Sequence, residues 1–362
     1  MAITINTNVA SLIAQKSLNN ATSRMNTAME RLSTGLKINS SKDDAAGSAV
    51  STKLDYKVSS LAVAQDNAQM GSSLLDTEEG TLDVIQSNMT RIRDLTEQAA
   101  NGTYGEDAMT AIKSEIEGRL KEVTRIAGTT EFNGKKLLDG SMDAGINLQV
   151  GITSGEDSVI NLEGSLFAKT DAASLLGEYK LTAKGNSSIQ KYNDTDVAAL
   201  ADMVKIGNDF FKNDGGALTK ATATEQTAAE KAWNEITDEA KKVNITAGTE
   251  YTVKDSKSAA DALDFIFTND ITAQAFLDNV DTALANVTDR KTAIGAAQQR
   301  VASAMEVTNV MSTNFTSANS LIKDADIAEE SSNYIKNQIL QQTASSLLAT
   351  ANQNPQIALS LI

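Results

Sequence analysis

The chain has no histidine, no cysteine and 1 proline among its 362 residues, and only 4% of its residues are aromatic. The first two absences remove the most common general base, the most common zinc ligands and every thiolate nucleophile. They exclude histidine-dependent triads, zinc centres and a disulfide framework, and they leave the redox compartment open. We therefore expect no enzyme activity, no metal and no cofactor.

The net charge and the distribution of apolar residues limit the kinds of partner that this chain can bind. The formal net charge of -15 argues against nucleic acid, because phosphate binding requires clustered lysine and arginine. No stretch approaches the roughly 20 apolar residues of a membrane helix, and the first residues lack the basic and apolar regions of a cleaved signal peptide. The 41% hydrophobic content, with so little proline and aromatic surface, favours long helices over a thick globular core.

Residues 8–36 place small and apolar side chains at alternating steps of four and three, which predicts one helix of a coiled coil. The line consists of Ala14, Leu18, Ala21, Met25, Ala28 and Leu32. Asn8 fits an N-cap and Gly35 a helix stop. Ser41 with Asp44 fits a capping box for the next helix.

The next helix is expected from about residue 43 to about residue 100, on the order of 85 Å long at 1.5 Å per residue. Its apolar line is Leu54, Leu61, Ala64, Ala68, Gly71, Leu75, Glu78, Leu82, Ile85, Met89, Ile92, Thr96 and Ala99. A helix of this length needs partner helices along its whole length. A shorter amphipathic pattern over residues 109–126 predicts a helix that folds back antiparallel to it.

The middle of the chain has a different amino-acid composition from its two ends. Asn133-Gly134 predicts a tight turn, and the alternation over residues 146–150 predicts a strand, so we expect a small β-hairpin region. Residues 165–270 are rich in Gly, Thr, Asp and Lys and contain the single tryptophan, Trp233, which we interpret as a core residue of an inserted α+β domain.

The three-four pattern returns near the C-terminus. A first line comprises Leu277, Val280, Leu284, Val287, Ile294, Val301, Met305, Phe315 and Ile322, and a last helix carries Ile335, Ile339, Leu340, Ala344, Leu347, Leu348 and Ala351. The expected fold is mainly α, with paired N- and C-terminal coiled-coil helices forming a long antiparallel rod. The expected domains are 1–42 with 320–362, 43–164 with 271–319, and the insert 165–270.

The terminal helices are candidates for self-assembly, because a head-to-tail contact that does not close generates a filament. The expected assembly seam is Leu18, Ala21, Met25, Ala28, Leu32, Ile335, Ile339, Leu340, Leu347 and Leu348. The same periodicity also fits the core of an ordinary helical bundle, so periodicity alone leaves both alternatives open.

Motifs at both ends resemble the bacterial flagellins. At the N-terminus these are Ile5-Asn6-Thr7-Asn8 and the stretch from Glu30-Arg31-Leu32-Ser33-Thr34-Gly35 to Asp43-Asp44-Ala45-Ala46-Gly47. At the C-terminus they are Gln338-Ile339-Leu340-Gln341-Gln342, Ala349 to Gln356 and Leu359-Ser360-Leu361. The resemblance covers about two-thirds of the chain and leaves the insert unmatched.

The resemblance implies a structural subunit of the extracellular flagellar filament, with terminal helices lining the central channel and the insert forming the outer surface. It implies a homopolymer exported without a cleaved signal peptide through the flagellar export apparatus. The implied partners are an export chaperone, a cap protein and hook-associated proteins.

Residues 89–101 resemble the flagellin stretch bound by the mammalian innate immune receptor for flagellin, with Arg91, Leu95 and Glu115 at matching positions. Arg91, Leu95 and Gln98 are three and four residues apart, which places a charge, an apolar anchor and an amide on one helix face. The same face could instead pack against the next subunit.

Three alternatives are weighed against a filament subunit. A hook-filament junction protein shares the paired terminal helices, but the motifs at both ends disfavour it. A secreted coiled-coil adhesin would not need both ends to be apolar and self-complementary. An enzyme in the insert is disfavoured because a zinc protease needs histidine ligands, and adjacent acids such as Asp43-Asp44 are typical of a solvated helix face.

Overall fold

The computed structural model describes residues 8–182, 189–192, 202–206, 209–235, 242–244, 250–253, 258–259 and 262–360. The chain divides into two compact units. Unit 1 comprises Met1–Asp66, Val150–Ser154 and Met305–Ile362, and unit 2 comprises Asn67–Gln149 and Gly155–Ala304. Two long helices, α2 (Ala45–Ala99) and α7 (Asp270–Lys323), contribute residues to both units.

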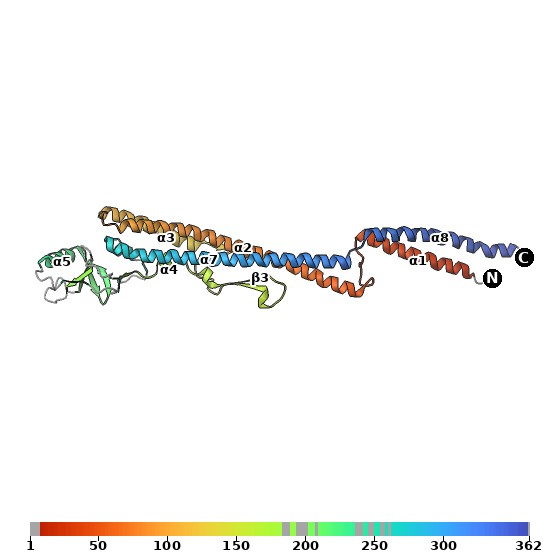
Figure 1. Cartoon of the computed structure of the whole chain (residues 1–362), viewed down its shortest axis with the longest axis horizontal. Helices are drawn as coiled ribbons and strands as arrows, with labels where there is room; N and C mark the ends of the chain where they lie inside the picture. Colours follow the sequence, from red (N-terminus) through yellow and green to blue (C-terminus); the bar gives the residue numbers. More distant parts are fainter. Residues whose placement is uncertain are drawn as a thin grey trace. The chain divides into compact units, whose positions relative to one another are not determined.

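In unit 1, α1 (Val9–Thr34) and α8 (Ile327–Ser360) lie side by side and antiparallel, so that both chain ends lie at the same end of the pair (Figure 1). The expected helix limits of α1 are confirmed. The Asn8 side chain accepts a hydrogen bond from the Ser11 amide, and Gly35 ends the helix with a φ of 74°. Glycine adopts that left-handed conformation without the steric cost that a Cβ would add.

The connectors of unit 1 are joined through their backbones. The Lys37 amide donates to the Lys323 carbonyl at 2.7 Å, and the Ala325 amide donates to the Gly35 carbonyl at 2.9 Å. The expected capping box at the start of α2 is wrong. Asp44 itself caps the helix, because its Oδ1 accepts from the amides of Ala46 and Gly47 and no residue to its N-terminal side is needed.

The expected apolar line of α2 is confirmed. All members from Leu61 to Ala99 are buried, and the helix runs over Ala45–Ala99 as the pattern predicts. In unit 2 this line packs with α3 (Glu106–Thr129), which returns alongside α2, and with α7, whose Val280, Val287 and Ile294 are fully buried. A long thin bundle rather than a thick globule therefore supplies the core.

Short strands follow α3. β1 (Glu131–Phe132) and β2 (Lys135–Lys136) form a hairpin whose turn residues Asn133 and Gly134 both have positive φ, as a two-residue turn of type I′ requires. β3 (Ile146–Gln149) pairs antiparallel with β4 (Val159–Leu162). Short helical elements accompany them: η1 (Glu156–Ser158), η2 (Gly164–Phe167) and α4 (Ala172–Leu176).

The insert contains a seven-stranded sheet in the order β10-β6-β7-β8-β9-β11-β5. The strands are β5 (Lys180–Thr182), β6 (Ile189–Tyr192), β7 (Met203–Ile206), β8 (Asp209–Asp214), β9 (Ala217–Lys220), β10 (Lys242–Asn244) and β11 (Glu250–Val253). Helices α5 (Ala223–Glu235) and α6 (Leu263–Ile266) accompany them. Trp233 is buried with its ring 5.7 Å from that of Phe210, so its expected core role and the α+β character of the insert are confirmed.

We predict opposite effects for two glycine substitutions in unit 2. A Cβ at Gly164 would overlap the backbone of Asp143, so Gly164→Ala is expected to cost about 1–3 kcal/mol of unfolding free energy. Gly80 lies within α2 with open space around it, so Gly80→Ala is expected to add up to about 1 kcal/mol. Urea denaturation followed by circular dichroism measures both; equal effects would contradict the close approach at Gly164.

Candidate assembly interface

The contact between α1 and α8 is built on small residues repeated every seven positions. Ala14, Ala21 and Ala28 are buried on α1, and Ala344 and Ala351 are buried on α8. A repeat of seven keeps one face of each helix toward its partner along the whole pair. Because alanine side chains are short, the two helix backbones can approach closely, and larger residues remain on the flanks.

Polar contacts along the pair fix its antiparallel register. The Asn8 Nδ2 donates to the Ala351 carbonyl at 2.8 Å near the chain ends. Midway, the Gln341 Nε2 donates to the Thr22 hydroxyl at 3.0 Å. A pair held only by alanines could slide, so these side-chain hydrogen bonds select one alignment of α1 against α8.

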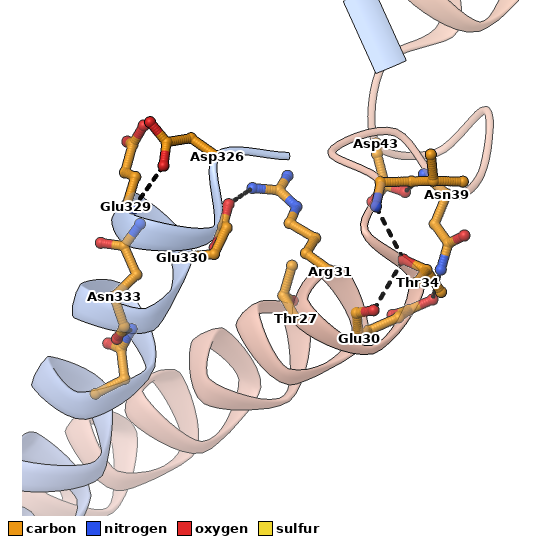
Figure 2. Close-up of polar contacts among 12 residues, drawn as sticks. Thr27, Glu30, Arg31, Thr34, Asn39, Asp43, Asp326, Glu329, Glu330 and Asn333 are labelled. Atoms are coloured by element: carbon orange, nitrogen blue, oxygen red, sulfur yellow. Dashed lines mark hydrogen bonds and ion pairs between the residues drawn. The ribbon is translucent and has the colours of Figure 1, made fainter. Parts of the chain in front are cut away.

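An ion pair joins the two helices where they meet the connectors. The Arg31 Nη1 lies 2.8 Å from the Glu330 Oε1, and the Glu330 side chain is only 10% exposed (Figure 2). Nearby, the Asp326 Oδ1 accepts from the amides of Ala328 and Glu329 and so caps α8.

The structure separates the ten expected seam residues into two groups. Ala21 and Ala28 are buried, and the half-buried members are Leu18, Met25, Leu32 and Leu348. The remaining four, Ile335, Ile339, Leu340 and Leu347, are 47–59% exposed, and two of them, Leu340 and Leu347, line hollows between α1 and α8. Their place in an assembly seam between copies stays a prediction. Within the chain, the pairing face of α8 is the face that carries the short side chains.

Two polar residues of α8 that sequence reasoning did not select belong to that pairing face. Glu330 and Asn337 are buried, and together with Ala344 they form a series with one member every seven residues. The available signal was this repeat of seven, in register with the alanines of α1. This repeat was missed because glutamate and asparagine are polar and are not counted as core residues in a search for apolar periodicity.

Large apolar side chains remain exposed on both helices. On α1 they are Val9, Leu12, Ile13 and Met29, and on α8 they are Ile327, Ile335, Ile339, Leu340 and Leu347. On one side of the pair, hollows of about 290 and 400 Å³ lie between the helices and share Arg24, Asn337 and Leu340. The pair of α1 and α8 therefore leaves large apolar side chains uncovered on both helices.

The expected receptor-contact residues do not share one exposed face. The Arg91 Nε lies 3.2 Å from the Glu115 Oε1, and both side chains are exposed, as is Gln98. A hydrogen bond from Arg119, together with Arg91, holds the pKa of Glu115 below its usual value. Leu95 is only 2% exposed, so its expected role as an accessible apolar anchor is wrong for the single chain. It belongs to the core because it follows Ile92 at helical spacing.

The described part of the chain offers neither a metal site nor a membrane span. Among the described residues, no group of three or more acidic side chains is placed to hold a metal ion. The described helices include none that is both long and apolar enough to span a bilayer.

Comparison with known proteins decides the family. The model of the bacterial flagellin N-terminal helical region matches residues 5–143, and that of the C-terminal helical region matches residues 277–362. The chain is 33% identical over its full length to polar flagellin F of Vibrio parahaemolyticus and to flagellin E of Vibrio cholerae, and covers 100% of each. The chain belongs to the bacterial flagellin family. This flagellin is therefore a structural subunit of the extracellular flagellar filament, and the family is a structural one.

Some solved structures resemble part of this chain. FliC from Burkholderia pseudomallei is 22% identical with a TM-score of 0.38, over 64% of this flagellin and 99% of that chain. A flagellar hook-associated protein from Legionella pneumophila is 15% identical with a TM-score of 0.45, over 74% of this flagellin and 97% of that chain.

We predict that Arg31 and Glu330 are energetically coupled. Glu330→Gln and Arg31→Gln should each loosen the contact between α1 and α8, and a double-mutant cycle should give a coupling of about 1–2 kcal/mol, because a partly buried carboxylate loses its charged donor. Amide hydrogen exchange of the two helices measures the opening. Additive single effects would show that the ion pair does not hold the helices.

We also predict that Leu95 acts through the core and Gln98 does not. Leu95→Ala should cost about 2–5 kcal/mol of unfolding free energy, because it opens a cavity among buried side chains. Gln98→Ala, on the exposed face of the same helix, should change it by less than about 0.5 kcal/mol. Urea titrations of unit 2 helicity compare them, and a small cost for Leu95→Ala would restore it as a surface residue.

Proposed function

We propose that copies of this chain assemble into the filament through the exposed apolar faces of α1 and α8. One observation carries the proposal. The alanine faces of α1 and α8 already pack against each other, yet nine large apolar residues on the two helices remain exposed. Leaving them in water is unfavourable by about 25 cal/mol per Å² of apolar area. Packing against other copies removes that area from water.

The register of the pair supports repeated rather than closed contacts. Because α1 and α8 run antiparallel and are fixed by polar contacts, every copy presents the same apolar surface in the same orientation. A surface that contacts a different surface of the next copy adds subunits in one direction, and it gives an open filament when the rotation between copies does not close a ring. Assembly of this kind needs no cofactor and no covalent step.

The finer organisation follows the same proposal. Residues 1–42 with 320–362 would line the channel, residues 43–164 with 271–319 would form the wall, and the insert 165–270 would face outward. Export without a cleaved signal peptide, the export apparatus, an export chaperone, a cap protein and hook-associated proteins are proposed from membership of the family.

Receptor recognition is proposed for a smaller set of residues than the sequence indicates. Arg91, Gln98 and Glu115 are exposed on α2 and α3, and the ion pair between Arg91 and Glu115 joins these helices. Such a charged pair suits the rim of an interface, where its contribution is to specificity and association rate. Leu95 would then support the surface from below.

The assembly proposal predicts that two apolar residues control polymerisation. Ile339→Ser with Leu347→Ser should raise the critical concentration for filament formation more than tenfold, because each buried side chain contributes about 1.5–3 kcal/mol. The matched control is Gln338→Ser with Gln342→Ser, which alters exposed polar residues of the same helix. Sedimentation and electron microscopy after raising concentration measure both.

The monomer should retain its fold in either variant, since all four side chains are exposed in the single chain. Unchanged circular dichroism with lost filaments supports the proposal. Native polymerisation by the Ile339 and Leu347 variant would exclude this face of α8 as the assembly surface.

A further inference from the structure

Glu78 occupies an unusual position in the α2 core. Its relative exposure is 0%, and neither carboxyl oxygen has a hydrogen-bond partner. It stands between Leu75 and Leu82 in the apolar line, where the neighbouring members are hydrocarbon. Burying an unpaired charge of this kind is so costly that the group takes up a proton instead. Burial accordingly raises the pKa of Glu78 to about 8, and only Arg290 opposes the shift.

Arg290 of α7 is engaged elsewhere. Its Nη1 donates to the Ala168 carbonyl at 2.8 Å and to the Thr170 hydroxyl. Within the described residues its Nε and Nη2 make no hydrogen bond. Thr170 is itself fully buried, and its amide donates to the Leu138 carbonyl. The guanidinium therefore ties the segment 164–176, which contains η2 and α4, to α7.

Several charged groups on the elements around this site are paired with one another, and Asp289, which precedes Arg290 on α7, is exposed and has the same charge as an ionised Glu78. On α7, Lys291 pairs with Asp83. The α2 carboxylates of Asp76 and Glu79 accept hydrogen bonds from the Gln298 side chain of α7. On α3, Arg119 pairs with Glu115 and Arg125 with Glu122. In the segment itself, Lys169 pairs with Asp171. Arg290 is thus the cation that Glu78 can recruit when it ionises.

We propose that Glu78 and Arg290 form a proton-controlled latch for the segment 164–176. With Glu78 neutral, Arg290 holds Ala168 and Thr170 and the segment is closed on α7. When Glu78 releases its proton to solvent, its carboxylate attracts the guanidinium away from Ala168 and Thr170, and this displacement weakens both hydrogen bonds from Nη1. The latch is a property of one subunit, so its failure would leave the assembly proposal intact.

The sign of the pH dependence follows from the raised pKa. A carboxyl that is freed by opening titrates near its ordinary value of 4.5, whereas the closed form holds its proton until about pH 8. Opening therefore becomes more favourable as the pH rises between these values and levels off above about pH 8. Each unit of pKa difference between the two forms corresponds to a tenfold change in the opening equilibrium.

The test is amide hydrogen exchange of the full-length monomer between pH 5.5 and 9.5, corrected for the intrinsic rate at each pH. We expect opening of 164–176 to increase at least tenfold from pH 6 to pH 8.5 in the native chain, and to be independent of pH in Glu78→Gln. The control is Glu79→Gln, which removes the adjacent carboxyl on the less buried side of α2 and should retain the native profile.

Three outcomes would overturn the latch. A flat profile in the native chain, which needs no variant to interpret, would show that Glu78 does not couple to the segment. Matching profiles for the native chain and Glu78→Gln would assign the effect to another group. An equal rise in the peptides of α3 would show that Glu78 acts on the whole unit rather than on the segment.

Discussion

The structure depends on one constraint: each long helix carries an apolar stripe that is too narrow to be buried except against another helix. The partner of the first helix is the last one, with bonded side chains between 299 and 343 residues apart, and α2 similarly relies on α7. Joining the ends in this way costs chain entropy, but that cost grows only slowly with the length of the loop. The middle of the chain can consequently hold an insert without disturbing the pairing.

A two-helix pair buries little surface, and this accounts for the contrast between the helices. The α2 line is enclosed because α3 and α7 both cover it, and its apolar members from Leu75 to Ile92 are fully buried. The pair of α1 and α8 encloses mainly alanines and leaves larger residues such as Ile13 and Leu347 in water. A pair of helices by itself therefore leaves more apolar surface in water than a bundle in which two helices cover the third.

Polar residues in these cores have different consequences according to their partners. Glu330 is nearly buried but has Arg31 at 2.8 Å, so it aligns two helices. Glu78 is fully buried and has no hydrogen bond, so it is held neutral and can respond to pH. The residue type is the same in both cases, and the neighbouring cation decides the behaviour.

Sequence patterns were enough to predict the helices, the limits of α1 at Asn8 and Gly35, the buried line of α2 and the turn at Asn133-Gly134, because helical period, capping and turn chemistry are local properties. The motifs at the two ends indicated the family. The tertiary structure decided which face of α8 meets α1, that Leu95 is core rather than surface, that Asp44 caps α2 alone, and how the strands of the insert are ordered. These features depend on contacts between residues that are far apart in the sequence, which local patterns do not predict. Helix pairing can favour a stripe of alanines over a stripe of larger apolar residues, because short side chains allow the two backbones to approach closely.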